Sequence, residues 1–494
     1  MKLRPEVPLD PLLDVEFDKA FGLMTELVDL RLADKLQPLG PAAVYTTSVV
    51  LWMLVYQRMH AGASLEAAVK QFILTKPDFC PDNKRIRDDT LSASTAAYSA
   101  GRKRTKREVT QWLANTVSQS IIDTSQPSLR GMRAFLVDGT TVSLPPTPQL
   151  QKMFPPASNQ HGEGVWPIVN LVVAHELESG AALIPVIGPM YGQEAISETA
   201  MIRECVQQFP EKSIGIADAG FGIFFVAHTI HDLGHEFLLR MTKTRFNSLR
   251  NQATLVTEGI GSKTYRHRWV PSDKERRKYP NLPPDTHLDV LLHEVKISAE
   301  TTLFLVTSLP DSATVVTTLY GRRFEIEVEI RDVKVTLDIE NIRATTVGMF
   351  YKELMTSIVS YNLLVQFRRQ AAQLAGLKPK QLSFTKVWNT YRIFLMNAMY
   401  TEPEKWRESY RTALYYAMRD KLPNRPGRHF PREAYTKRNK STQFGKRKKQ
   451  KKPEIVDEIK PLTPKRVPLG ISPRTYPKFG PRLAMILVLL CFSI

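Results

Sequence analysis

Three acidic residues occupy positions in the sequence where carboxylates can do chemistry. Asp138 ends the apolar stretch FLVD, Asp218 ends the apolar stretch IGIAD, and Glu327 lies within the charged segment YGRRFEIEVEIRDVK. An acid at a buried strand needs either hydrogen-bonded structure or a bound cation. Carboxylates are natural ligands of Mg²⁺, and two such ions about 3.5–4 Å apart can catalyse phosphodiester chemistry. We therefore expect Asp138, Asp218 and Glu327 to be catalytic and to bind metal.

The charged segment reads as a helix, and its periodicity singles out one glutamate. At 100° per residue from Tyr320, Arg323 falls at about −60°, Glu327 at about −20° and Lys334 at about −40°. These four side chains are predicted to share one narrow face. The cations on it would contact DNA phosphates, so Tyr320, Arg323 and Lys334 are candidate DNA-binding residues.

The other two glutamates, Glu325 and Glu329, fall on the opposite side of the same wheel. We expect them to face solvent or a neighbouring element. On the helix alone, Glu327 could equally be a surface ion pair with Arg323. The two strand aspartates favour the catalytic interpretation.

The elements around these acids follow from hydrophobic spacing. Helical periodicity dominates up to about residue 122, and β-branched stretches follow from Arg133 in the order three strands, helix, strand, helix, strand. This order predicts an α/β fold with a mixed sheet. The expected domains are a helical N-terminal DNA-binding domain (1–130), a catalytic core (131–242 and 301–345), a partly β insertion subdomain (243–300), a C-terminal helical region (346–422) and a basic tail (423–494).

The chain is strongly basic, with 68 Lys and Arg against 49 Asp and Glu and a formal net charge of +19. This balance suits a partner with dense negative charge, either nucleic acid or an anionic membrane surface. Residues 424–452 hold twelve Lys or Arg against one acid, so we expect them to be disordered when free and to bind DNA non-specifically. A second cluster contains Arg102, Lys103 and Arg104, which we expect to contact DNA, with a solvated helix face as the alternative.

Membrane and secretory classes are not expected. The apolar stretches at 49–56 and at the end of the chain are shorter than the roughly 20 residues that cross a bilayer, and the first is predicted to be a buried core helix. Acidic residues interrupt the N-terminal segment, so no signal peptide is predicted. Three widely spaced cysteines, Cys80, Cys205 and Cys491, favour neither a disulfide framework nor a zinc cluster.

The spacing of Tyr320, Arg323, Glu327 and Lys334 resembles a family signature. It is similar to the Y-x2-R-x3-E-x6-K pattern of DDE transposases from bacterial insertion sequences, in the family named after insertion sequence four. The stretches LVDGTTVSL, IADAGFG, LVTSLPDS and VSYNLLVQFRRQAA also resemble that family. The resemblance covers roughly residues 130–370.

The resemblance implies an RNase H-like core with Asp138, Asp218 and Glu327 as its metal-binding triad. It implies two Mg²⁺ ions, which Mn²⁺ can replace. Some family members carry a β insertion whose Trp stacks on a flipped base, and Trp269 is the candidate here, with a core position as the alternative.

By resemblance, the reaction is cut-and-paste DNA transposition: cleavage at the inverted-repeat ends of the element, then strand transfer into target DNA. The implied partners are double-stranded DNA and a second copy of the chain in a synaptic homodimer. A cytoplasmic, nucleoid-associated location in a bacterium is expected. The alternatives are a non-catalytic or domesticated DNA-binding protein derived from a transposase, and a plain nuclease of the same fold.

Overall fold

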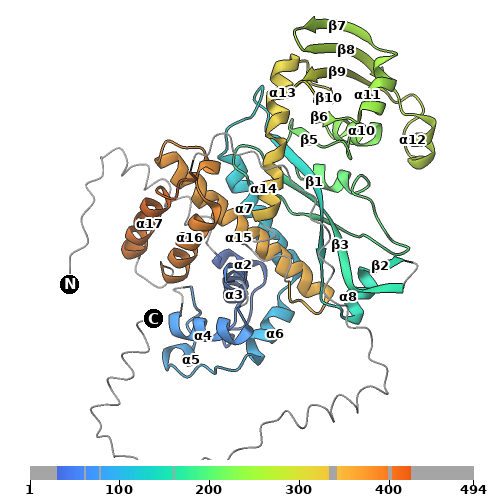
Figure 1. The fold of residues 1–494 in the computed structure, drawn as a ribbon. Helices are drawn as coiled ribbons and strands as arrows, with labels where there is room; N and C mark the ends of the chain where they lie inside the picture. The colour runs from blue at the N-terminus through green and yellow to red at the C-terminus, as the bar shows by residue number, and fades with distance from the viewer. Residues whose placement is uncertain are drawn as a thin grey trace, which may run out of the picture. The chain divides into compact units, whose positions relative to one another are not determined.

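The computed structural model describes residues 30–60, 63–76, 79–159, 162–332, 342–398 and 403–423. All of them belong to one compact unit, which extends to Pro423 (Figure 1). Lys334 and the basic stretch 424–452 lie outside the described residues. The predictions made for them therefore stay predictions.

A ten-stranded mixed sheet forms the centre of the structure. Its strands are hydrogen-bonded in the order β2-β3-β1-β5-β6-β10-β9-β8-β7, with β4 paired to β3. β1, β5 and β6 are mutually parallel, and the remaining pairs are antiparallel. This confirms the predicted mixed α/β class. The strands are β1 (Ala134–Ser143), β2 (Pro156–Asn159), β3 (Gly162–Glu176), β4 (Val186–Pro189), β5 (Ile214–Ala217), β6 (Glu236–Arg240), β7 (Thr254–Gly259), β8 (Ser262–Trp269), β9 (Leu288–Lys296) and β10 (Thr302–Thr307).

The central strands are apolar because both of their faces are covered. Residues 134–137 of β1 and all of β5 are buried, as expected for parallel strands between helical layers. One detail of the prediction is wrong, because Asp138 lies inside β1 and not at its end. Residues 138–143 continue the strand since β3 supplies an antiparallel partner along their whole length.

The strands of the predicted insertion extend the same sheet. β9 pairs with β10, and β8 and β7 follow at the outer edge. Two short helices, α11 and α12, accompany these strands, so the stretch is partly β as expected. The hydrogen-bonded sheet continues through residues 243–300. That this segment is a separate subdomain therefore stays a prediction.

Helices precede, interrupt and follow the sheet. The N-terminal group is α2 (Arg31–Leu36), α3 (Thr47–Met59), α4 (Leu65–Thr75), α5 (Lys84–Arg87), α6 (Ala96–Arg104) and α7 (Arg107–Asp123). The sheet region contains α8 (Pro148–Met153), α9 (Ile202–Val206), α10 (Phe224–Asp232), α11 (Lys243–Arg250), α12 (Asp273–Lys278), α13 (Ala313–Gly321), η1 (Arg322–Phe324) and α14 (Glu325–Arg331). The C-terminal group is α15 (Val347–Leu374), η4 (Pro379–Gln381), α16 (Phe384–Ala398) and α17 (Pro403–Ala417).

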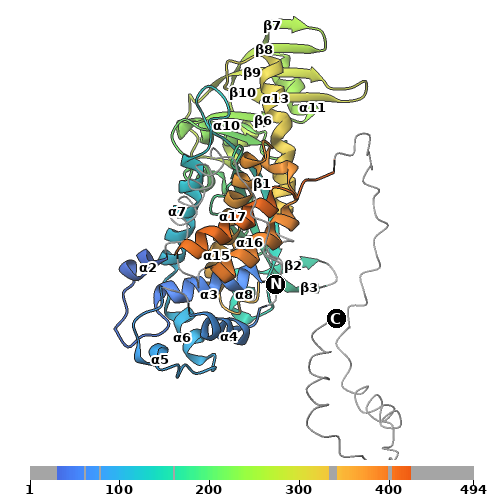
Figure 2. The same ribbon diagram turned by 90° about the vertical axis from the view of Figure 1, so that its left-hand side faces the viewer.

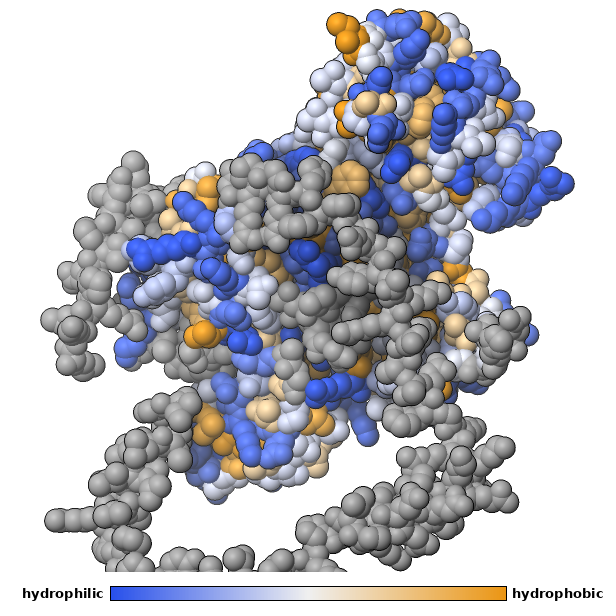
Figure 3. All heavy atoms as spheres, in the orientation of Figure 1, coloured by the Kyte–Doolittle hydropathy of each residue, from blue (hydrophilic) through white to orange (hydrophobic). Residues whose placement is uncertain are grey.

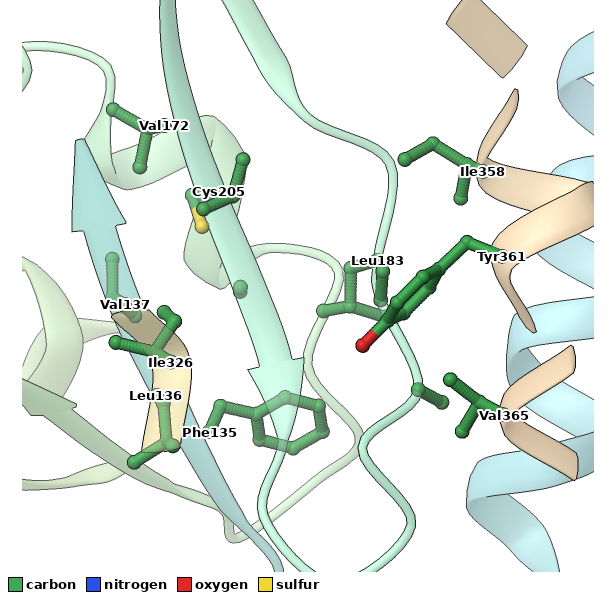
Figure 4. Packing of buried hydrophobic residues seen from close by; sticks show 14 of the residues in the cluster. Phe135, Leu136, Val137, Val172, Leu183, Cys205, Ile326, Ile358, Tyr361 and Val365 are labelled. Atoms are coloured by element: carbon green, nitrogen blue, oxygen red, sulfur yellow. The ribbon is translucent and has the colours of Figure 1, made fainter. Parts of the chain in front are cut away.

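The long helix α15 joins the other groups. It packs against α3 and α7 on one side and against α16 and α17 on the other (Figures 1 and 2). Its side chains Ile358, Tyr361 and Val365 point towards Leu183 after β3, in the buried core shown in Figure 4. The predicted core helix at 49–56 is confirmed as part of α3, where residues 49–55 are buried. Within the described residues, every helix is too short or too polar to cross a bilayer.

Candidate active site

The sheet register places the two aspartates side by side. Val137 of β1 pairs with Ala217 of β5 in parallel, so Asp138 and Asp218 follow directly after paired residues on neighbouring strands. Each carboxylate is oriented by the amide of a nearby glycine. Gly139 N–H donates to Asp138 Oδ1 at 2.8 Å, and Gly220 N–H donates to Asp218 Oδ1 at 2.8 Å.

Glu327 reaches the aspartates from α14, which packs on β1 through the fully buried Ile326 (Figure 4). The predicted helix is real but not continuous. It consists of α13, one 3₁₀ turn (η1) and α14, and the 3₁₀ turn changes the rotation between Tyr320 and Glu327. The predicted contact between Arg323 and Glu327 is present, and Tyr320 lies close enough to Arg323, Asp138 and Asp218 for their charges to shift the pKa of its hydroxyl.

The guanidinium of Arg323 brings the three carboxylates together. Its Nη2 lies 2.9 Å from Asp138 Oδ2 and 3.6 Å from Asp218 Oδ2, and its Nη1 lies 3.0 Å from Glu327 Oε1. The Arg323 side chain is only 10% exposed, whereas Asp218 and Glu327 are 38% and 41% exposed. The cluster is thus closed on the Arg323 side and open to solvent on the carboxylate side.

Burial and the neighbouring positive charge shift the pKa of the Asp138 carboxyl group in opposite directions. Burial raises the pKa of its carboxyl group, while the Arg323 guanidinium and the Gly139 amide oppose the rise. Asp218 and Glu327 add to it, because like charges disfavour one another. A bound cation would relieve this repulsion.

Tyr320, a further residue of the signature, is buried beside the cluster. Tyr320 is 2% exposed, and burial raises the pKa of its hydroxyl to about 12. It lies beneath the site, near Arg323 and Arg240, and offers little surface to a ligand. Its assignment as a DNA contact stays a prediction that this position does not favour.

Glu325 and Glu329, the other two glutamates of the charged segment, face a neighbouring element. This is one of the two positions that the sequence predicts for them, the other being solvent. Glu329 is buried at 4% exposure and lies 2.9 Å from Lys380 Nζ and 3.6 Å from His175 Nδ1. Glu325 binds Lys380 and Arg322. Both glutamates therefore attach α14 to the rest of the protein and do not face solvent.

The cation cluster of α6 is largely used inside the protein. Arg102 forms an ion pair with Glu353 of α15 at 2.6 Å, and Arg104 donates to the Tyr45 carbonyl at 2.8 Å. Lys103 is exposed. Of the three predicted DNA contacts, Lys103 is the one whose side chain has no such partner among the described residues.

Trp269 belongs to the core of the insertion strands. Its side chain is 4% exposed and packs edge-on against Phe224 of α10, with ring centroids 5.4 Å apart. This position fits the alternative, in which Trp269 is a core residue. A role in stacking on a flipped base would require it to become exposed.

Sequence reasoning missed one acidic residue of the site. Glu198, in the loop between β4 and α9, places its carboxyl group directly over Gly139, so that a Cβ at residue 139 would lie 2.0 Å from Glu198 Cδ. Asp138 and Asp218 both raise the pKa of Glu198, after the larger effect of burial. The loop sequence YGQEAISETA carries no recognisable motif, and the only signal was the glycine that follows Asp138.

Carboxylates are the type of ligand that a hard divalent cation prefers. Three of them, from separate elements, meet at the Arg323 guanidinium. In this arrangement, no three His, Cys, Asp or Glu side chains of the described residues are close enough to hold a metal ion. The Arg323 guanidinium lies between the carboxylates and neutralises part of their charge.

The central part of the chain matches a known protein family. A family model described as "Transposase DDE domain" matches residues 129–363, a little under half of the sequence. This segment contains all four acids described above as well as Arg323. The comparison with curated proteins gave no match.

One similar solved chain is the piggyBac transposase, in a cryo-EM structure of its synaptic complex with hairpin DNA. The two chains are 11% identical, over 85% of this chain and 86% of that one, with a TM-score of 0.36. A similarity this low supports no structural argument. The family match, by contrast, coincides with the carboxylate cluster, and it supports a DDE transposase.

Proposed function

We propose that this protein is a DDE transposase of the insertion-sequence-four type, which cleaves DNA at the inverted-repeat ends of its element and transfers the freed strand to target DNA. The observation that carries the proposal is the meeting of Asp138, Asp218 and Glu327 around Arg323. These acids come from two parallel strands and a helix that are far apart in sequence. An RNase H-like core is supported by the mixed sheet and by the adjacent parallel strands β1 and β5.

The three carboxylates would hold two Mg²⁺ ions, or Mn²⁺ in their place. When bound, such ions activate the attacking oxygen and stabilise the leaving oxygen of a phosphodiester. The protein's own contribution is position: the Gly139 and Gly220 amides fix the aspartates, and the packing of Ile326 fixes α14. Side chains fixed in this way hold the catalytic groups in a productive geometry before the substrate binds.

DNA reaches the site from its open, carboxylate side. Near that side, α12 presents the exposed cations Lys274, Arg277 and Lys278. Tyr279, at the end of this helix, stacks on Phe225 with ring centroids 3.8 Å apart and contacts Thr199 in the same loop as Glu198. Figure 3 shows hydrophilic side chains gathered over this helix. We propose α12 as a phosphate-contacting surface.

A synaptic homodimer and a location at the bacterial nucleoid complete the proposal. Both follow from the resemblance to insertion-sequence transposases and from the net charge of +19. The basic tail beyond residue 423 would add non-specific affinity for DNA.

The first prediction tests the triad. Asp138→Asn, Asp218→Asn and Glu327→Gln should each reduce cleavage of the element's terminal-repeat DNA by at least about 1000-fold, while its binding is retained, because the substitutions remove a charge but little volume. Cleavage and joining are measured on gels with Mg²⁺ or Mn²⁺, and binding by fluorescence anisotropy. Glu300→Gln, on an exposed loop, is the matched control.

The outcomes separate the candidate functions. Cleavage followed by joining of the ends supports a transposase, and hydrolysis without joining indicates a plain nuclease. Binding without cleavage in the wild-type protein indicates a DNA-binding protein derived from a transposase. Wild-type cleavage in any one triad variant overturns the assignment of that residue.

A further inference from the structure

Lys380 joins the C-terminal part of the chain to the helix that carries Glu327. It lies in η4, beyond the residues 129–363 that match the transposase family. Its ammonium group forms ion pairs with both Glu325 and Glu329 of α14, at 2.9 Å from Glu329 Oε1. Because these two glutamates are one helical turn apart, a single lysine spans a turn of α14.

Glu327 points away from the face of α14 that Lys380 contacts. Two positions along a helix correspond to a rotation of about 200°, and Glu327 lies two positions from each of the paired glutamates. On its own side, Glu327 contacts Arg323, which also binds Asp138. An effect of Lys380 on Glu327 therefore passes through the helix.

α14 is too short to keep its orientation without contacts to the rest of the protein. It has seven residues, and isolated helices of this length are not stable in water. Just before it, Arg322 binds Glu178, and on its inner face Ile326 is fully buried. Lys380 supplies the attachment of the second half of the helix, since Glu329 lies there.

The contact with Lys380 matters most for Glu329. The Glu329 side chain is 6% exposed, and its Oε2 has no hydrogen-bond partner in the described part of the chain. Glu325, by contrast, is 25% exposed and is also bound by Arg322. Loss of the lysine removes the hydrogen-bond donor and the counter-ion of Glu329 together, and a buried carboxyl group without them is costly.

The turn that carries Lys380 is itself anchored in the C-terminal helices. Arg368 of α15 donates to the carbonyl of Leu382, directly after η4, at 2.7 Å. The Leu422 amide, which follows α17, donates to the Gln381 carbonyl at 2.7 Å. Lys380 therefore connects α15 and the end of α17 to α14.

We infer that Lys380 is a positioning residue of the active site. By holding Glu325 and Glu329, it sets the orientation of α14 and so the position of the Glu327 carboxylate relative to Asp138 and Asp218. The inference rests on the proposed function where it concerns catalysis. It also gives the C-terminal helices a part in the site, although they lie outside the matched domain.

Hydrogen exchange tests the attachment without reference to any activity. In Lys380→Met, the amides of α14 should exchange at least about 10-fold faster than in the wild type, because loss of the attachment increases local opening. β1 and β5 should exchange as in the wild type. Lys386→Met, at an exposed lysine of α16, is the matched control and should leave α14 unchanged. Equal exchange of α14 in the wild type and in Lys380→Met overturns the inference.

Kinetics test whether this attachment positions Glu327. On terminal-repeat DNA with Mg²⁺, Lys380→Met should lower the cleavage rate at saturating DNA roughly 10- to 100-fold and change the Kd for DNA by less than about threefold, because it displaces an acid and not a DNA contact. Lys380→Arg keeps the charge and should stay within about fivefold of the wild-type rate. A weaker Kd with an unchanged rate marks Lys380 as a DNA contact and overturns the inference.

A second background separates positioning from a loss of folded protein. Lys380→Met combined with Glu329→Gln changes both partners of the buried pair. The lysine substitution should reduce the cleavage rate by a smaller factor in this background than in the wild type, because the group that it holds is already altered. Equal reductions in the two backgrounds contradict the positioning role.

The proposed function fails by a different result. If the wild type neither cleaves nor joins terminal-repeat DNA, the transposase proposal fails, and the exchange of α14 still decides whether Lys380 holds the helix. If the wild type cleaves and Lys380→Met keeps the wild-type rate, the positioning role fails and the transposase proposal stands.

Discussion

At the scale of single residues, Arg323 has the most consequential position. It is nearly buried, its two terminal nitrogens contact three carboxylates, and its Nε is buried without a hydrogen-bond partner in the described residues. In the free protein, the guanidinium therefore supplies the positive charge that holds these acids together. The resemblance gives the same residue a role on DNA, and that role stays a prediction.

Removing this charge should destabilise the free protein more than the metal-bound one. In EDTA, Arg323→Gln should lower the free energy of unfolding by on the order of 1–3 kcal/mol, because partly buried carboxylates lose their counter-ion. Added Mn²⁺ should restore more stability to the variant than it adds to the wild type. Urea unfolding with and without metal measures both effects, with Arg277→Gln on exposed α12 as the control. Equal destabilisation with and without Mn²⁺ contradicts this role.

At the scale of elements, α14 is held by a partly buried ionic cluster formed by Glu325 and Glu329. Glu329 contacts Lys380 and His175, while Glu325 contacts Lys380 and Arg322. Burial raises the pKa of Glu329 to about 7, with Lys380 opposing the rise, and burial lowers the pKa of His175 to about 4. The position of Glu327 thus depends on a helix whose attachment contains titrating groups.

These pKa shifts predict how stability changes with pH. Between about pH 4.5 and 7 the unfolded chain releases the Glu329 proton while the folded protein retains it, so this group makes the protein less stable as the pH rises. Glu329→Gln removes that effect. Relative to the wild type, the variant should therefore gain stability from pH 5 to pH 8, by on the order of 3 kcal/mol at most. Urea unfolding of both proteins at the two pH values measures this gain. A difference that does not change with pH contradicts the prediction.

His175 changes the stability of the protein with pH in the opposite direction from Glu329. Its folded pKa lies below its usual value, so the unfolded chain binds the proton first as the pH falls through about 6.5 towards 4. Stability from this group is therefore lost on the acid side. The comparison of Glu329→Gln with the wild type isolates the glutamate, because His175 is common to both proteins.

At the scale of the whole molecule, α15 connects the N-terminal helices to the sheet. Asn362 is fully buried, donates to Ser118 of α7 at 2.9 Å and accepts from the Ala182 amide at 2.8 Å. The ion pair between Arg102 of α6 and Glu353 joins a second N-terminal helix to α15. The helices that were predicted to bind DNA are therefore packed on α15 and the sheet region, and cations used in that packing are not available to phosphates.

The salt dependence of DNA binding should show where the remaining cations act. Deleting residues 424–452, which carry 11 of the 19 net charges, should flatten the slope of log affinity against log salt by several units. Arg277→Ala on α12 should reduce the slope by roughly one. Anisotropy titrations from roughly 50 to 200 mM salt provide the slopes. An unchanged slope after the deletion means that this segment is not on DNA.

The sequence alone predicted the candidate acids of the site and the elements that carry them. Two local patterns carry this prediction: the apolar stretches before Asp138 and Asp218, and the helical spacing of Arg323 and Glu327. Both are local because strand and helix periodicity depend on neighbouring residues. A contact between Arg323 and Glu327 follows from such spacing. The mixed α/β class was predictable for the same reason.

Only the tertiary structure decided which side chains surround the acids. Contacts between segments distant in sequence decide three features of the site. They pair β1 with β5, place Glu198 over Gly139, and bury Trp269 and Tyr320. No local period encodes such contacts, since they arise when strands choose partners and loops fold back on the sheet. The position of Glu198 over Gly139 and the internal use of Arg102 therefore became visible only in three dimensions.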